Sequence, residues 1–216
     1  ITSSSIGCSG GNSTATISVT GGTQPYTYSW SPSANTGSVA TNLSAGIHSV
    51  TITDGNSCKK TTTVNIIAPA PLQNTITITP VTCNSFSNGS VSSNVTGGTP
   101  AYSFTWLPVN NNASSVSGIP AGSYTLIIKD ILGCSLTQTF SITQPPPLGL
   151  TLSHTDEFCI NADGSATVSV NGGTAPYSYT WTTSPVQTSS VATNLSTGNY
   201  TVNIKDAKGC NSQGMV

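Results

Sequence analysis

Hydrophobic and polar residues alternate along most of this chain, in short runs that return three times. In one early run Ala15, Ile17 and Val19 fall on one face, and threonines and serines fall on the other. A period of two is typical of half-buried β-strands. The runs are separated by Gly, Pro and Asn, which favour turns, and helical periodicity is absent. The pattern therefore predicts a chain of short strands, six or seven in each unit.

The most regular stretch is a glycine pair followed by an aromatic strand. It reads GGTQPYTYSW at 21–30, GGTPAYSFTW at 97–106 and GGTAPYSYTW at 172–181, with tryptophans 76 and 75 residues apart. This spacing predicts three tandem repeats. Alternate aromatic residues share a face, so we expect them in the core of each repeat: Tyr26, Tyr28, Trp30, Tyr102, Phe104, Trp106, Tyr177, Tyr179 and Trp181.

Short strands joined by Gly, Pro and Asn turns predict an all-β fold. We expect three tandem immunoglobulin-like antiparallel β-sandwich domains in an elongated array. Two proline-rich linkers, 68–71 and 144–147, set the expected domains at 1–70, 71–146 and 147–216. Such linkers are semi-rigid and extended. The chain ends soon after the second cysteine of the third repeat, where the other repeats are expected to continue into another strand, so we expect a piece of a longer array, truncated at its C-terminal side.

The charge inventory is sparse and excludes several kinds of partner. Lys and Arg number 5 and Asp and Glu 6, for a net charge of −1 in 216 residues. Without a basic stripe we expect no nucleic-acid partner and no polybasic membrane contact. No apolar run approaches the length of a membrane span, so we expect no membrane insertion in this chain.

Six cysteines recur in pairs, two in each repeat: Cys8 and Cys58, Cys83 and Cys134, Cys159 and Cys210. An even count in small domains with thin cores is typical of exported proteins that form disulfides. A zinc site would need clustered ligands, and neither a CxxC pair nor a partnering histidine is present.

Two pairings of these cysteines stay open. In immunoglobulin-like order, the two cysteines of one repeat would lie at opposite ends of strands roughly 20 Å long, too far apart for a bond. If the first strand bends, the bonds close within each repeat, as Cys8–Cys58, Cys83–Cys134 and Cys159–Cys210. Otherwise they run between neighbours, as Cys8–Cys134 and Cys83–Cys210. We favour the intradomain pairing because it closes every cysteine in the chain.

Catalytic chemistry is sparse, and we predict that the chain is not an enzyme and has no catalytic residues. His48 takes the place of a tyrosine in the equivalent strands, which indicates a packing role. His154, Asp156 and Glu157 form the only local cluster of ionisable groups and fit a solvated turn. No serine has a recurring His and Asp partner.

One acidic residue does recur before the turn that carries the second cysteine of each repeat, as Asp54, Asp130 and Asp206. Its side chain can cap the backbone of the turn, as Asp does in Asx turns. The alternative is a calcium ligand helped by loop carbonyls, but calcium usually takes several carboxylates. We favour the turn and expect no cofactor and no other metal.

The succession GGTxPYxYxW, NLSxGxYxVxIxD, GC and a proline-rich joint resembles the SprB-type repeat over all three units. That repeat occurs in very large surface adhesins of gliding and related Bacteroidota. In this chain the matching positions of the first repeat are Gly21, Gly22, Tyr26, Trp30, Leu43, Gly46 and Asp54. Pro100-Ala101 inverts the usual order before Tyr102, and His48 replaces a tyrosine.

The resemblance implies an extracellular stalk module of a long cell-surface filament, exported by the type IX route and associated with adhesion and gliding. The expected partners are neighbouring repeats of the same chain, with surface polysaccharide or other filament copies as further candidates. Two alternatives remain open. One is a spacer or carbohydrate-binding module of a secreted polysaccharide-active enzyme, and the other is a subunit of a polymeric surface sheath, since edge strands with few charges are poorly protected against pairing.

Overall fold

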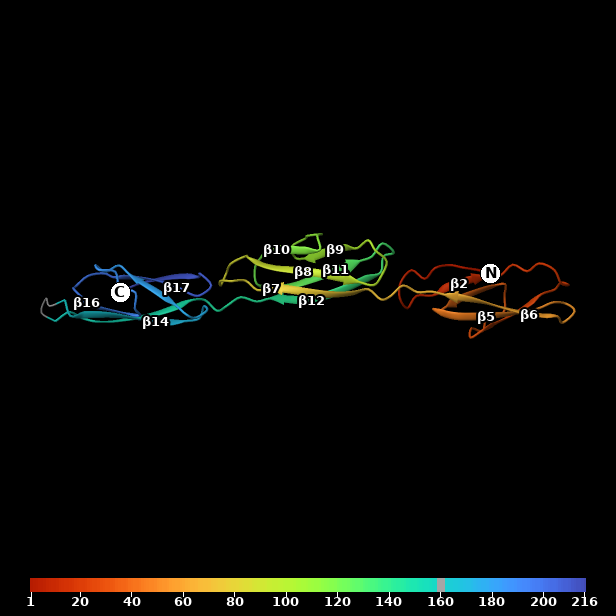
Figure 1. Ribbon diagram of the computed structural model, residues 1–216, viewed down its shortest axis with the longest axis horizontal. Helices are drawn as coiled ribbons and strands as arrows, with labels where there is room; N and C mark the ends of the chain where they lie inside the picture. The colour runs from red at the N-terminus through yellow and green to blue at the C-terminus, as the bar shows by residue number, and fades with distance from the viewer. Residues whose placement is uncertain (159–161) are drawn as a thin grey trace. The chain divides into compact units, whose positions relative to one another are not determined.

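The computed structural model describes residues 1–158 and 162–216. Within these ranges the regular structure consists of strands alone (Figure 1). The all-β expectation is confirmed. A helix long and apolar enough to span a membrane is not found among the described residues.

The first repeat forms two three-stranded sheets. Their orders are β1-β2-β4 and β3-β5-β6, and every pair of neighbours is antiparallel. The strands are β1 (Thr2–Ser3), β2 (Ser13–Thr16), β3 (Thr27–Ser31), β4 (Val39–Leu43), β5 (Gly46–Thr53) and β6 (Lys59–Ile66).

The other two repeats follow the same order, with sheets β7-β8-β10 and β9-β11-β12, then β13-β14-β16 and β15-β17-β18. The second repeat comprises β7 (Gln73–Thr79), β8 (Gly89–Thr96), β9 (Ser103–Leu107), β10 (Ser115–Ile119), β11 (Gly122–Lys129) and β12 (Ser135–Ile142). The third comprises β13 (Gly149–Thr155), β14 (Gly164–Asn171), β15 (Ser178–Trp181), β16 (Val191–Leu195), β17 (Thr201–Lys205) and β18 (Asn211–Met215). The expectation that the third repeat lacks the strand after its second cysteine is wrong: β18 follows Cys210 and pairs with β17, although its sequence lacks the apolar alternation of the other strands.

This strand order is that of an immunoglobulin-like sandwich. Named A, B, C, E, F and G in chain order, the six strands of a repeat give one sheet A-B-E and another C-F-G, the division found in immunoglobulin domains without their D strand. The predicted fold class is therefore confirmed.

Apolar residues at alternate positions of the strands fill the cores, as the sequence pattern predicts. In the first repeat the core includes Trp30, Leu43 and Val50, all buried. In the third, Trp181 and Val202 hold equivalent places. All three tryptophans are buried, whereas the tyrosines and the phenylalanine expected beside them are half-buried: Tyr26, Tyr28, Tyr102, Phe104, Tyr177 and Tyr179.

By the density of its internal contacts the chain divides into two compact units. The first contains residues 1–75, 93–114 and 125–138, and the second contains 76–92, 115–124 and 139–216. Each unit thus holds one outer repeat together with part of the second repeat. The domain boundaries at 70/71 and 146/147 stay a prediction.

Candidate functional site

The features that recur with the most detail lie where one repeat meets the next. Each such joint combines an aspartate-centred turn that carries a cysteine, a glycine-pair turn, a proline-rich linker and a disulfide. We define the joint by these four parts.

The recurring aspartate organises the cysteine turn. In the first repeat, Asp54 Oδ1 accepts the N–H groups of Asn56 and Cys58, each at 2.9 Å. Its Oδ2 accepts the N–H of Thr23 at 3.1 Å, which ties this turn to the glycine-pair turn. The other repeats repeat the set: Asp130 with Leu132, Cys134 and Thr99, and Asp206 with Lys208, Cys210 and Thr174.

These N–H groups stabilise the ionised carboxylates. They hold the pKa of Asp54 and Asp130 below the ordinary value of 3.8, with the N–H of Thr23 and of Thr99 as the largest cause, respectively. At Asp206 burial is the largest single influence and raises the pKa, but the N–H bonds together outweigh it and the pKa is lowered. A charged acceptor that holds backbone donors is the expected physical cause.

The sequence left two roles open for this aspartate, a cap of the turn backbone and a calcium ligand. The observed hydrogen bonds are those of a turn cap. Both oxygens of each carboxylate already accept N–H groups, so a calcium ion would have to compete with three donors at each site. In residues 1–158 and 162–216, no group of three or more His, Cys, Asp or Glu side chains gathers in a way that could hold a metal.

The glycine-pair turn is held by a tyrosine from the strand that leaves it. Tyr26 Oη donates to the Gly21 carbonyl at 2.7 Å, and Tyr102 and Tyr177 donate in the same way to Gly97 and Gly172. The glycines of these turns have positive φ, between +60° and +78°. Glycine adopts that conformation without the steric penalty of a side chain.

In the second and third repeats the preceding linker lies on this glycine turn. Gly98 N–H donates to the Ala70 carbonyl at 2.8 Å, and Gly173 N–H donates to the Pro146 carbonyl at 3.1 Å. A methyl group at Gly97 would overlap the Pro71 carbonyl oxygen, so only glycine leaves room for the linker. The linkers are therefore fixed by hydrogen bonds as well as by their prolines.

At the third repeat, Gly172 makes the equivalent close approach to Pro147. The next residue of each linker is a leucine that packs on the second glycine of the turn: a Cβ built at Gly98 would lie 2.9 Å from a Leu72 methyl carbon, and one at Gly173 would lie 2.7 Å from a Leu148 methyl carbon. The sequence shows the glycines and the prolines as separate motifs, and no local pattern indicates that they meet.

A disulfide closes each joint. Cys8 is bonded to Cys134 and Cys83 to Cys210, with Cα atoms 5.5 Å apart in both pairs. The bonded residues are 126 and 127 positions apart, so each bond joins a first-turn cysteine of one repeat to the aspartate-turn cysteine of the next.

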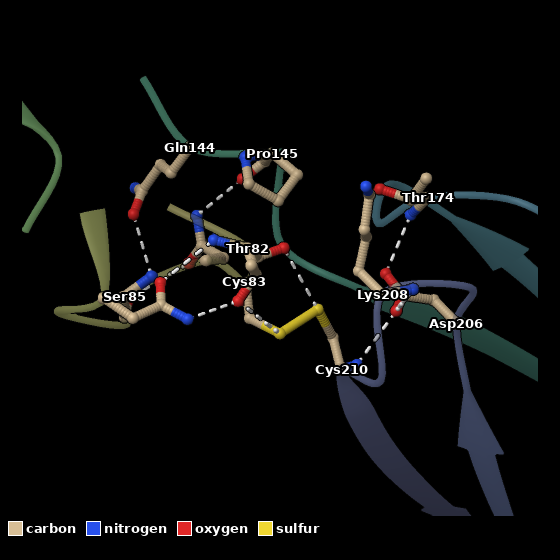
Figure 2. The surroundings of a disulfide bond; sticks show 11 residues. Thr82, Cys83, Ser85, Gln144, Pro145, Thr174, Asp206, Lys208 and Cys210 are labelled. Atoms are coloured by element: carbon tan, nitrogen blue, oxygen red, sulfur yellow. Dashed lines mark hydrogen bonds between the residues drawn. A yellow bond between two sulfur atoms is a disulfide. The ribbon is translucent and has the colours of Figure 1, made fainter. Parts of the chain in front are cut away.

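Figure 2 shows the second of these bonds and its surroundings. The first turn of the second repeat also contacts the linker there: Ser85 N–H donates to Gln144 Oε1 at 2.8 Å, and Asn84 Nδ2 donates to the Pro145 carbonyl at 3.2 Å. Cys210 Sγ lies 3.4 Å from the Thr82 carbonyl oxygen. This approach is a contact and not a hydrogen bond, because a disulfide sulfur has no proton to donate.

The intradomain pairing favoured from the sequence is wrong for these four cysteines, and the alternative pairing between neighbours is present. The reason is strand length. Cys8 precedes β2 at the end of the repeat where Gly46 pairs with Ile66, whereas Cys58 lies at the other end, between Thr53 and Lys59. The eight residues of β5 separate these ends by about 25 Å, and the first strand does not bend to close that distance.

Two cysteines remain outside these bonds. Cys58 is free and exposed. Cys159 lies outside the described residues.

The expected packing role of His48 is visible in its contacts. His48 is buried, and its Nε2 lies 2.9 Å from the Ser44 carbonyl. The tyrosines at the equivalent positions donate to the carbonyl four residues earlier in the same way, Tyr124 to Pro120 and Tyr200 to Ser196. The histidine thus replaces the tyrosine in a hydrogen bond that fixes the turn before the strand.

The ionisable cluster of the third repeat has two separate parts. His154 Nε2 lies 3.3 Å from Asp156 Oδ1, and both side chains are exposed. Glu157 accepts the N–H groups of Ala162 and Thr197, each at 2.8 Å, and these bonds lower its pKa. The cluster thus orders a loop, as a solvated turn would.

Comparison with known proteins gives one family match. A family model described as the SprB repeat matches residues 1–35, 75–111 and 151–186, which together make up half of the chain. Each match includes a glycine-pair turn and the aromatic strand that follows it. No curated protein matches the chain.

Several solved structures of immunoglobulin domains align with the chain at low similarity. The N-terminal eight Ig domains of Down Syndrome Cell Adhesion Molecule are 10% identical, with a TM-score of 0.43 over 88% of this chain and 32% of that one. An amphioxus IgVJ-C2 molecule is 15% identical, with a TM-score of 0.29 over 67% and 94% of the two chains. Extracellular domains 3–5 of Drosophila OTK are 11% identical, with a TM-score of 0.29 over 90% and 85%. The fold assignment above therefore rests on strand order.

Proposed function

Because this chain belongs to the SprB repeat family, we propose that it is a non-enzymatic stalk segment of an extracellular, cell-surface protein that serves adhesion and gliding. The observation that carries the proposal is the pair of disulfides that each join one repeat to the next. A stalk has to transmit tension, and a second covalent path at each boundary suits that task.

The disulfides also favour an oxidising compartment, since such bonds persist outside the cytoplasm. In the chain-entropy model, closing a loop of more than a hundred residues is worth about 4–5 kcal/mol, which is large beside the core of so small a domain. The carboxylates that recur in the repeats hold turns, which supports a structural role for them over a catalytic one.

Antibody labelling of live cells tests the proposal. A fluorescent antibody raised against the chain is applied to intact cells of the source organism, and antibody pre-absorbed with the chain serves as the control. We expect signal in long filaments on the cell surface that travels along the cell during gliding. Signal confined to the culture medium would contradict the proposal and favour accessory modules of a secreted polysaccharide-active enzyme.

A further inference from the structure

The aspartate turn of the first repeat has the same structure as its two counterparts, but its cysteine is unpaired. Asp54 Oδ1 accepts the Cys58 N–H at 2.9 Å, the same distance at which Asp130 and Asp206 hold Cys134 and Cys210. The turn therefore has the same hydrogen bonds with a free cysteine as the other two turns have with a disulfide-bonded one.

The surface around Cys58 is also uncovered, where the other two repeats are covered. Cys58 is exposed, Cys134 is half-buried and Cys210 is 7% exposed. The aspartates follow the same order: Asp54 is half-buried, whereas Asp130 is 5% exposed, as is its counterpart in the third repeat.

The glycine-pair turn beside Cys58 is open as well. A Cβ built at Gly21 meets nothing within 4 Å, whereas one at Gly97 or Gly172 would overlap a linker carbonyl. Gly22 has Asp54 and Tyr26 as its neighbours and lacks the leucine that packs on the equivalent glycines.

A hollow of ≈ 370 Å³ lies next to this turn. Apolar Ile17, Val19 and Ile52 line it together with Tyr26 and Cys58. In the third repeat, Leu148 and, from β13, Leu150 and Leu152 pack on the core instead.

From these observations we propose that this end of the first repeat, formed by the Gly21–Gly22 turn, the hollow and Cys58, is a binding site for another SprB repeat placed immediately before Ile1. The linker of that repeat lies on Gly21 and Gly22, an apolar residue after its prolines fills the hollow, and its first-turn cysteine forms a disulfide with Cys58. The two joints of this chain show the same contacts already made.

The bond forms by thiol–disulfide exchange with a low-molecular-weight disulfide as oxidant. The Cys58 thiolate attacks that disulfide, forms a mixed disulfide and releases one small thiolate. The thiolate of the incoming cysteine then attacks the Cys58 sulfur and displaces the second small thiolate. Two protein thiols are oxidised, one small disulfide is reduced to two thiols, and the two protons pass to the released thiolates.

The test adds one repeat of the chain's own sequence. Residues 1–76 are placed before Ile1, which puts the added first-turn cysteine 126 positions before Cys58, the separation found between Cys8 and Cys134. Cys159 and the second cysteine of the added repeat are replaced by serine. Free thiols are counted by alkylation without denaturant in glutathione buffer, and the disulfides are mapped by mass spectrometry.

We expect one alkylated thiol, Cys58, in the 216-residue Cys159→Ser chain and none in the extended chain, where Cys58 is bonded to the added first-turn cysteine. An extended chain in which Cys58 stays alkylatable, or bonds elsewhere while Cys8–Cys134 forms normally, would overturn the proposal.

A matched pair of variants separates the docking of the linker from simple thiol reactivity. Gly21→Ala adds a methyl group where the linker would lie, whereas Gly10→Ala adds one at φ +79° with nothing within 4 Å. In the extended chain, Gly21→Ala is expected to slow the formation of the Cys58 bond at least tenfold and Gly10→Ala to leave it unchanged. Equal rates would contradict the docked linker.

This inference rests on the proposed stalk function, because an array of repeats supplies the partner. The two can fail separately. Label confined to the culture medium would reject the surface stalk while leaving the Cys58 bond in place, and an alkylatable Cys58 in the extended chain would reject the binding site without affecting the surface label.

Discussion

At the scale of single residues, one carboxylate orders two turns in every repeat. The sequence predicts its local part, because an Asp side chain at the start of a turn commonly accepts the backbone N–H groups that follow it. It could not predict the bond from Asp54 to the Thr23 N–H, since these residues are 31 positions apart and meet only when β3 and β5 pair. The residue was thus identified and half of its role was missed.

Lowering the pH tests how much these carboxylates contribute to stability. The folded-state pKa of Asp54, Asp130 and Asp206 lies below the ordinary 3.8, so their contribution to stability is present above that value and is lost as pH falls through the folded pKa. We expect the melting temperature to be level from pH 6 to about pH 4 and to fall steeply below. The variant with Asp54→Asn, Asp130→Asn and Asp206→Asn should have a lower melting temperature at pH 6 and lose most of the fall below about pH 4. An unchanged pH profile in this variant would show that the three carboxylates do not hold the turns.

His48 offers a second test at this scale. Its Nδ1 is buried without a hydrogen-bond partner, whereas Tyr124 and Tyr200 leave no such atom unsatisfied. Leaving a buried polar atom unpaired costs about 1–3 kcal/mol. His48→Tyr should therefore stabilise the first repeat by about 1 kcal/mol, seen as roughly fivefold slower hydrogen exchange of β5 and β6. His154→Tyr, at an exposed position, is the control, and faster exchange in His48→Tyr would contradict the prediction.

At the scale of elements, the strands were predictable and the joints were not. Alternation along β2 and β5 predicts which side chains face the core, because a strand places successive residues on opposite faces. The linkers were expected to be semi-rigid from their prolines alone. Their hydrogen bonds to Gly98 and Gly173 depend on turns some 27 residues away, which no local pattern reveals.

Gly97→Ala measures what the linker contact contributes. The substitution places a methyl group against the Pro71 carbonyl and strains a residue at φ +70°. Left-handed backbone alone costs a non-glycine residue about 1–2 kcal/mol. Gly10→Ala has that strain without the contact. We expect Gly97→Ala to lower the melting temperature more than Gly10→Ala and to speed exchange of the Gly98 amide; equal effects would mean that the linker is not held there.

At the scale of the whole molecule, the disulfides decide how the repeats are joined. Strand length indicates that the two cysteines of one repeat lie too far apart to bond. The intradomain pairing rested only on the fact that it closes every cysteine within the chain. The structure supports the distance argument: an eight-residue β5 keeps Cys58 away from Cys8, and the bond crosses to Cys134. Which cysteines bond depends on how neighbouring repeats are joined, and the sequence of a single repeat does not contain that information.

A tryptic map of the non-reduced chain tests this central claim most directly. Cleavage after Lys59, Lys60, Lys129, Lys205 and Lys208 separates the bonded partners. Pairing between neighbours predicts that peptide 1–59 is linked to 130–205, and that 61–129 is linked to 209–216. An unlinked peptide 1–59 with an internal bond, together with 61–129 linked to 130–205, would show that the bonds close within repeats and would contradict the account.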